Sequence, residues 1–296
     1  MCKQDAAPRV SPYVVSADIQ LLLGTWAKAR SFTLPDETIF RDLREEFCDF
    51  SQAIFSNFEL VMEEEISYGL RLLTQESGLA ALSLDRVYFY SRLNLDITRY
   101  VDFGERNIKD TGQGRRPGSL PLKAQFKRIK KMGIKEVILV DDVLFTGSLM
   151  EVVLSILSKM GIKVPVVCVG IGVREGIERL KKFGIEVKCV RRYESVVDEI
   201  CERDFYPGVP LSGRLVKGKE NIGAPYILPF GDPEKWASIP RQWAQGFSQF
   251  CLKQTIKLYE AIEQSSDKIV LCEDLGRKVV FCPDGRFVDR LKKFVH

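Results

Sequence analysis

One stretch, residues 135–150, constrains the fold more than any other part of this 296-residue chain. Residues 137–140 are four consecutive apolar residues, mostly β-branched, that follow the turn Met132-Gly133. They predict a fully buried, central strand of a parallel sheet. The strand is expected to stop at Asp141 and Asp142, at its exposed carboxyl end, because an isolated buried carboxylate is very costly.

A phosphate-binding turn is predicted directly after the two acids. Thr146-Gly147-Ser148 supplies hydroxyls, a flexible backbone and an N-cap for the apolar-periodic segment 149–157. The first N–H groups of such a helix, together with its positive dipole end, favour an anion. Acids beside a phosphate site indicate a ligand that carries both a phosphate and vicinal hydroxyls, since ionised carboxylates accept hydrogen bonds from hydroxyls.

Two other interpretations of this stretch were weighed. A receiver domain also ends a strand in two acids, but it needs that strand at its start and an aspartate ending a later strand. The later apolar runs here, 164–169 and 185–190, end in Gly170 and Arg191. The second alternative is an Asp-initiated turn and helix cap that binds nothing.

The segment Asp-Asp-Val-Leu-Phe-Thr-Gly-Ser after a hydrophobic strand resembles the phosphoribosyl-diphosphate loop of the type I phosphoribosyltransferases. The resemblance implies that Asp141 and Asp142 hold the ribose 2′ and 3′ hydroxyls, with Mg²⁺ bound there directly or through these hydroxyls or water. It also implies that the rest of the loop wraps the 5′-phosphate. The family often ends the motif with a second threonine, where this chain has Leu149. The phosphate-binding residues are then Val143, Leu144, Phe145, Thr146, Gly147 and Ser148.

Residues before the acid pair are expected to contact the diphosphate. The first strand is predicted at 85–91, and Arg92 follows it where the resembling family contacts the diphosphate, although the glycines usual there are absent. Residues 102–120 hold four glycines and few apolar anchors, which predicts a mobile loop. The family closes such a loop over the diphosphate, and Lys109, Arg115 and Arg116 would reach it; a plain solvated linker is the alternative.

The fold class follows from strands that alternate with helices beyond the acid pair: α/β, with a doubly wound parallel sheet like that of the type I phosphoribosyltransferases. Three regions are expected: a helical N-terminal cap (1–80), this core (81–215), and a C-terminal extension (216–296). The extension should contain helices and a β-hairpin from 268–272 and 278–282. In the cap, Glu63, Glu64 and Glu65 are expected on a solvated helix face.

Phe205 and Tyr206 are candidates for stacking on an acceptor base, with ordinary packing as the alternative. Eight cysteines without C-x-x-C spacing and a single histidine, His296, make a zinc or iron site improbable. No signal peptide or membrane span is visible, so a cytoplasmic protein is expected. The net charge of +4 is mild and does not mark a dedicated nucleic-acid binder. The basic helix expected at 122–132 has an apolar face with Phe126 and Ile129, which favours a solvated outer surface over a nucleic-acid partner.

The resemblance implies a phosphoribosyltransferase that binds 5-phosphoribosyl 1-diphosphate with Mg²⁺ and transfers the phosphoribosyl group to a nitrogenous acceptor, a base or a nucleotide. The alternative is a non-catalytic sensor of the sugar diphosphate or of a nucleotide, or an effector of a bacterial defence system. A homodimer or a protein partner stays open. The acceptor itself is not identified by any residue pattern.

Overall fold

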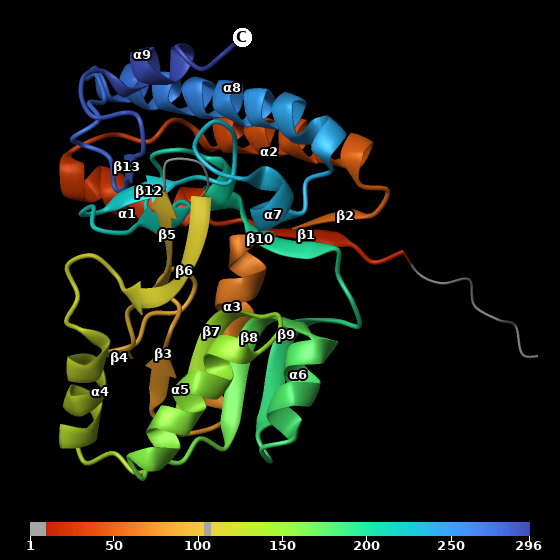
Figure 1. Cartoon of the computed structure of the whole chain (residues 1–296), viewed down its shortest axis with the longest axis vertical. Coiled ribbons are helices and arrows are strands. Elements are labelled where there is room, and N and C mark those ends of the chain that lie inside the picture. The colour runs from red at the N-terminus through yellow and green to blue at the C-terminus, as the bar shows by residue number, and fades with distance from the viewer. Residues whose placement is uncertain (1–9, 104–107) are drawn as a thin grey trace, which may run out of the picture.

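The computed structural model describes residues 10–103 and 108–296. Figure 1 shows two parts stacked along the long axis, a lower part built on one parallel sheet and an upper part rich in helices. None of the described helices has the length and apolar character required to span a bilayer.

The lower part is a five-stranded parallel sheet. Its order is β4 (Leu93–Asn94), β3 (Ala81–Ser83), β7 (Ile138–Leu144), β8 (Val166–Val173) and β9 (Glu186–Tyr193). Helices cover both faces because alternate strand residues point to opposite sides. On one face lies α3 (Glu63–Gln75); on the other lie α4 (Leu122–Lys131), α5 (Ser148–Lys159) and α6 (Arg174–Lys181). The α/β class and the doubly wound parallel sheet are therefore as expected.

The upper part contains two further sheets. One is parallel, with β1 (Tyr13–Ser16) between β10 (Asp198–Cys201) and β2 (Phe58–Val61). The other runs β13 (Lys278–Val279), β12 (Ile222–Ala224), β11 (Arg214–Val216), β5 (Ile97–Phe103) and β6 (Ile108–Arg115).

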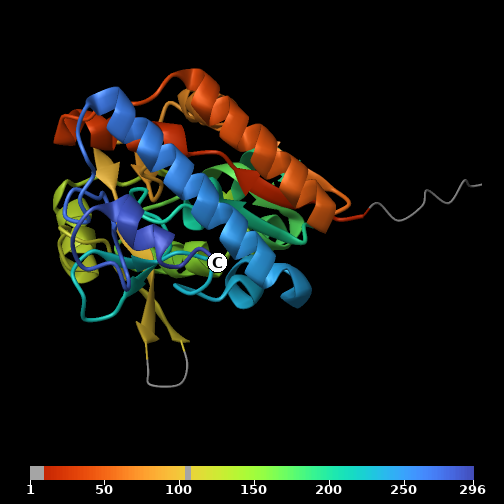
Figure 2. The ribbon, with the colours of Figure 1, turned by 90° about the horizontal axis from the view of Figure 1, so that it is seen from above.

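Helices from both ends of the chain close this upper part. They are α1 (Ile19–Arg30), α2 (Glu37–Ile54), α7 (Pro233–Ala237), α8 (Arg241–Ser266) and α9 (Phe287–Lys292), with a 3₁₀ turn, η1, at Glu202–Phe205. Figure 2 shows α8 crossing the top of the molecule near α2. One hydrophobic core joins residues 13–55 to residues 200–291, so the expected N-terminal cap and C-terminal extension pack together.

The sequence suggested an all-helical N-terminal region, but the structure shows that this region also contains strands. Strands β1 and β2 each have four residues, too few to show a period of two, and β1 pairs with β10 some 185 residues later in the chain. Helix α3 packs on the lower sheet and not within the cap.

The predicted first strand at 85–91 is wrong. The strand is β3, at 81–83, and the apolar run after it forms a loop. The carboxylate of Asp85 organises this loop, accepting hydrogen bonds from the backbone N–H groups of Val87, Tyr88 and Phe89 at 2.7–2.8 Å. Aspartate side chains commonly compete with strand pairing in this way.

Two further expectations need correction. Within the segment 102–120 that was expected as a mobile loop, residues 108–115 form β6, which pairs antiparallel with β5; residues 104–107 lie outside the described residues. The predicted C-terminal hairpin is absent from the described residues, because Lys278–Val279 pairs with β12 and Leu271 bridges to Arg286.

A buried ionic network ties α2 to α3 and to η1. Arg44 lies 2.9 Å from a carboxylate oxygen of Glu63 and 3.2 Å from one of Glu202. Glu202 also accepts a hydrogen bond from the backbone N–H of Asp18 at 3.1 Å. Glu63 is only 3% exposed, which corrects the expectation of a solvated position for this residue, whereas Glu64 is exposed and Glu65 is half-buried.

We expect Arg44→Met to destabilise the protein by about 3–5 kcal/mol, because it leaves two buried carboxylates without their counter-ion. Urea denaturation measures the free energy of unfolding. Arg41→Met is the matched control, since the Arg41 side chain is 65% exposed on the same helix. Equal stability of the two variants would contradict the role assigned to the network.

Candidate functional site

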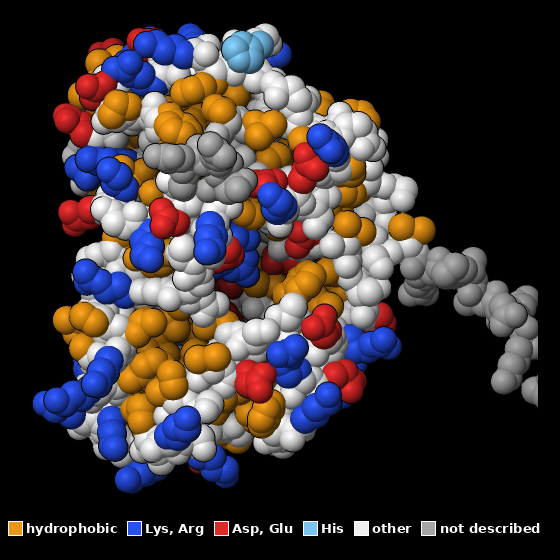
Figure 3. All heavy atoms as spheres, in the orientation of Figure 1, with side chains coloured by type: hydrophobic (Ala, Val, Ile, Leu, Met, Phe, Trp, Pro, Cys, Tyr) orange, Lys and Arg blue, Asp and Glu red, His pale blue; other side chains and the backbone are white. Residues whose placement is uncertain are grey.

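A cavity of about 270 Å³ opens where the carboxyl ends of the parallel strands meet the upper part, and its volume is near the lower end of the ~300–1,000 Å³ of small-molecule sites. Figure 3 shows a hollow near the middle of this face, with acidic and basic side chains in its walls. The lower wall is the continuous segment Asp141–Met150 with Leu84. The opposite wall comes from β5, β6, β10 and the segments after β10. Its polar residues are Thr98, Arg99, Gln113, Arg116, Glu199, Cys201, Arg203, Asp204 and Tyr226.

The acid pair lies inside β7, not after it. Asp141 pairs with Val169, and β7 continues alongside β8 to Leu144, three residues beyond the expected end. Both carboxylates are nevertheless partly exposed and line the cavity. Gly170 makes this packing possible, because a Cβ there would lie 2.8 Å from the carbonyl oxygen of Asp142.

Asp141 and Asp142 line the floor of the cavity, and a third carboxylate, Asp85, is buried close to them. Burial first, and then the charges of Asp142 and Asp85, raise the pKa of Asp141 well above its usual range. Burial and the charge of Asp142 raise the pKa of Asp85 to about 6. Such crowding favours a ligand that brings positive charge or hydrogen-bond donors to the acids.

The turn after β7 has the form expected of an anion cradle. Gly147 adopts φ +76°, in the left-handed region, and α5 begins at Ser148. The Thr146 and Ser148 hydroxyl oxygens lie 3.0 Å apart. The side chain of Leu144 is buried in the core, so only its backbone is available at the cavity.

Helix α6 packs against the backbone of this turn. A Cβ at Gly176 would lie 2.6 Å from the carbonyl oxygen of Phe145, so only glycine allows the helix to approach this closely. From the same helix, Arg179 donates to the hydroxyl of Ser148 at 3.4 Å and contacts Glu151 at 3.3 Å.

Two arginines face the acids. Arg203 contacts Asp142 at 3.7 Å, and its backbone N–H and guanidinium both donate to Asp18. Arg116 lines the cavity, and its Nε is buried without a hydrogen-bond partner. Burial and the nearby Arg203 charge lower the pKa of Arg116 from its ordinary value. An anion in the cavity would relieve this cost.

Glu199 is the most deeply buried carboxyl of the opposite wall, at 9% exposure. Its Oε1 accepts a hydrogen bond from the hydroxyl of Ser16 at 2.8 Å. Burial first, and then the charges of Asp142 and Asp198, raise the pKa of Glu199, while Ser16 and Arg203 lower it; together they bring it to about 8. At neutral pH this carboxyl therefore carries a proton and can act as a hydrogen-bond donor.

The structure brings some predicted site residues together and separates others. The acid pair, the turn residues 143–148 and Arg116 all line the main cavity. Lys109 and Arg115 are exposed on β6 and do not line it, and Arg92 lines a second cavity.

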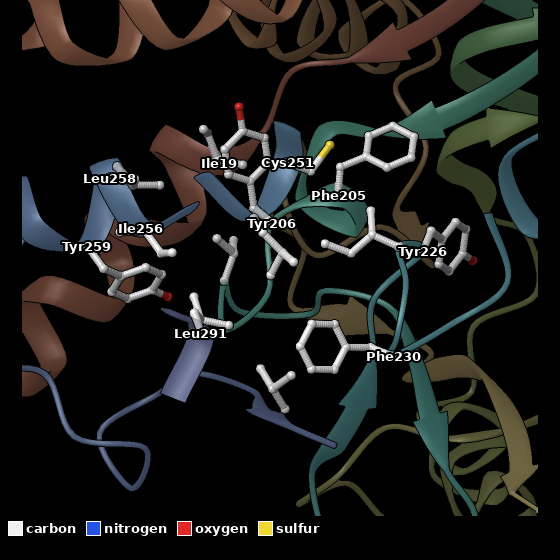
Figure 4. Packing of buried hydrophobic residues seen from close by; sticks show 14 of the residues in the cluster. Ile19, Phe205, Tyr206, Tyr226, Phe230, Cys251, Ile256, Leu258, Tyr259 and Leu291 are labelled. Carbon is white, nitrogen blue, oxygen red and sulfur yellow. The ribbon is translucent and has the colours of Figure 1, made fainter. Parts of the chain in front are cut away.

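Phe205 and Tyr206 are core residues, which corrects the expectation that they stack on a base. Both are 0% exposed. Figure 4 shows them among buried side chains that include Ile19 and Cys251, and Phe205 packs edge-on against Phe247 at 5.0 Å. Neither ring has a face free for a ligand.

Sequence reasoning missed Asp85, Arg99, Glu199, Arg203 and Asp204. None of these residues belongs to a recognisable sequence motif. Most of them come close to the acid pair only because β1 pairs with β10 and β5 pairs with β11. The one available signal was Asp85, a lone acid directly after an apolar strand.

The cavity offers few metal ligands of its own. Among residues 10–103 and 108–296, no group of three or more His, Cys, Asp or Glu is placed to hold a metal ion. Asp141 and Asp142 offer oxygen ligands, and proteins commonly bind Mg²⁺ through one or two carboxylates plus substrate oxygens and water. The cavity therefore fits a Mg²⁺ ion that arrives with a substrate.

No family model and no curated protein matches this sequence. Solved structures to which it is similar include orotate phosphoribosyltransferase from Aeropyrum pernix, with 17% identity, 44% of this chain and 70% of that chain covered, and a TM-score of 0.27. Adenine phosphoribosyltransferase from Thermoanaerobacter pseudethanolicus gives 13% identity, 43% and 80% coverage, and a TM-score of 0.25. TT1426 from Thermus thermophilus is 20% identical, with 45% of this chain and 84% of that chain covered and a TM-score of 0.28. Because these TM-scores are below 0.5, the similarities carry no functional argument, and the proposal below rests on the residues of the cavity.

We expect Gly176→Ala to destabilise the protein by about 1–3 kcal/mol, because the new methyl group overpacks against the backbone of the turn. Gly246→Ala is the matched control: Gly246 lies in α8 with open space around it, so alanine should stabilise by up to ~1 kcal/mol. Thermal denaturation of both variants provides the measurement. A neutral Gly176→Ala would mean that the turn does not depend on α6.

We expect the stability of the wild type to fall, relative to Glu199→Gln, as the pH rises. The folded-state pKa of Glu199, about 8, lies above the ordinary value of 4.5, so its stabilising contribution is full below pH 4.5 and is lost as the pH rises to 8. Melting temperatures between pH 5 and pH 9 test this, with Glu186→Gln on the exposed edge of β9 as control. A difference between Glu199→Gln and wild type that does not change with pH would refute the raised pKa.

Proposed function

We propose that this protein binds 5-phosphoribosyl 1-diphosphate in the main cavity and transfers the phosphoribosyl group to a nitrogenous acceptor, with release of diphosphate. The observation that carries the proposal is the shared cavity of the acid pair, the hydroxyl-bearing turn and Arg116. A phosphorylated pentose with a second anionic group needs all three of these at once.

Each part of the cavity would have a separate task. The turn Phe145–Ser148 and the first N–H groups of α5 would hold the 5′-phosphate. Asp141 and Asp142 would accept hydrogen bonds from the ribose hydroxyls, and their negative charge would stabilise the positive charge that develops on the sugar. Arg116 would neutralise the departing diphosphate.

Mg²⁺, when bound with the substrate, would supply further neutralisation of the diphosphate. Glu199, on the wall opposite the acid pair, is placed to exchange a hydrogen bond or a proton with the acceptor. The acceptor would enter between this wall and the sugar. The wall is polar and charged, and Tyr226 is the aromatic residue that lines it.

Asp141→Asn with Asp142→Asn tests the proposal, because the double variant keeps the shape of the pair and removes its charge. Diphosphate release from phosphoribosyl diphosphate, measured with Mg²⁺ and a panel of nucleobases, should fall on the order of 10²-fold or more. Asp49→Asn, at an exposed position of α2, is the control and should leave the rate unchanged.

Turnover that survives loss of the acid pair would overturn the assignment of the site. Binding of phosphoribosyl diphosphate by the wild type without turnover of any acceptor would instead favour a sensor of this ligand. Calorimetric titration of phosphoribosyl diphosphate with Mg²⁺ separates the two outcomes.

A further inference from the structure

A second cavity, of about 300 Å³, lies beside α4 and apart from the acid pair. Two segments contribute arginines to its wall: Arg86 and Arg92 come from the loop between β3 and β4, and Arg128 comes from α4. The sequence singled out Arg92 for a diphosphate contact, and the structure places it here.

The charge of this cavity is unbalanced. Arg86 lies 2.8 Å from Asp96, the one acidic residue of the lining. Arg92 and Arg128 have no carboxylate within 4.0 Å among the described residues. Two guanidinium groups are thus left to pair with an anion from solution, and guanidinium matches phosphate geometry well.

The polar groups between the arginines are held in place. Gln125 is buried, accepts a hydrogen bond from the backbone N–H of Asp96 at 2.7 Å and donates to the carbonyl of Leu120 at 2.7 Å. Asn94 and Ser119 also line the cavity. This wall is fixed by the fold and does not need a ligand to form it.

The remaining wall is apolar. It consists of Leu93, Leu120, Ile129 and Met132, and the side chains of Leu120 and Met132 are each 52% exposed. Exposed apolar surface beside unpaired cations fits a ligand with an anionic end and a planar or apolar body. A free inorganic anion would leave this apolar surface uncovered.

The second cavity shares a segment of backbone with the main site. The backbone N–H of Arg116 donates to the carbonyl of Asp96 at 3.0 Å, and the hydroxyl of Ser119 donates to the carbonyl of Arg116 at 2.7 Å. Arg116 faces the acid pair, while Asp96 and Ser119 face the second cavity. A ligand in one cavity therefore touches the residues that hold a wall of the other.

We propose that the second cavity is a binding site for a small phosphate monoester with a planar body, of the nucleoside monophosphate class. Its phosphate pairs with Arg92 and Arg128, and its planar body covers Leu120 and Met132. This proposal does not rest on the reaction proposed for the main cavity.

Adenosine 5′-monophosphate is the probe, titrated calorimetrically against the full chain. Wild-type protein binds it, and Arg92→Gln with Arg128→Gln weakens binding at least tenfold. Lys127→Gln with Lys130→Gln removes the same charge from exposed positions of α4 that do not line the cavity, and leaves the affinity unchanged. Thr146→Val with Ser148→Ala, in the turn of the main cavity, also leaves it unchanged.

Amide hydrogen exchange supplies a second readout. Binding at the second cavity protects residues 116–120 and the first turn of α4. Loss of binding in the Thr146/Ser148 variant, with the Arg92/Arg128 variant unaffected, would place the nucleotide in the main cavity and overturn the proposal. No binding at millimolar nucleotide, or equal weakening in the Lys127/Lys130 variant, would also overturn it.

Discussion

Two adjacent carboxylates within a central strand constrain the structure built around them. Asp141 and Asp142 lie in β7 with Asp85 nearby, and burial raises the pKa of Asp141 well above its usual range. Charges held this close in a poorly hydrated site are costly unless cations or donors face them. The opposite wall supplies that need through Arg203 and Arg116.

The upper part of the molecule holds these cations in position through a chain of buried ionic contacts. Arg203 is fixed by Asp18, and the adjacent Glu202 binds the backbone of Asp18 and the side chain of Arg44. Arg44 in turn pairs with Glu63, at the start of the helix that covers the lower sheet. The N-terminal region is thus part of the cavity's support, although none of residues 10–80 lines the cavity.

The C-terminal region acts on the same wall from the other side. Arg277 is 2% exposed and donates to the carbonyls of Leu211, Ser212 and Gly213 at 3.1–3.3 Å. Leu211 and Gly213 line the main cavity. Burial and the charge of Arg116 lower the pKa of Arg277 to about 9. The guanidinium is buried at this cost because it satisfies three backbone acceptors.

The sequence by itself determined the parallel α/β sheet and the lower wall of the cavity, because both depend on neighbours in the chain. The apolar run before Asp141, the turn 146–148 and the helix after it are local signals, and local signals can be recognised without knowledge of the fold.

Tertiary structure alone decided the opposite wall. Glu199 and Arg203 reach the acid pair because β10 pairs with β1, and Arg116 reaches it because β6 pairs with β5. The pairing of β4 with β3 places Arg92 at a second cavity, and Phe205, just after β10, lies in the core. Contacts of this kind join residues tens to hundreds of positions apart, and no pattern within a short window of sequence records them.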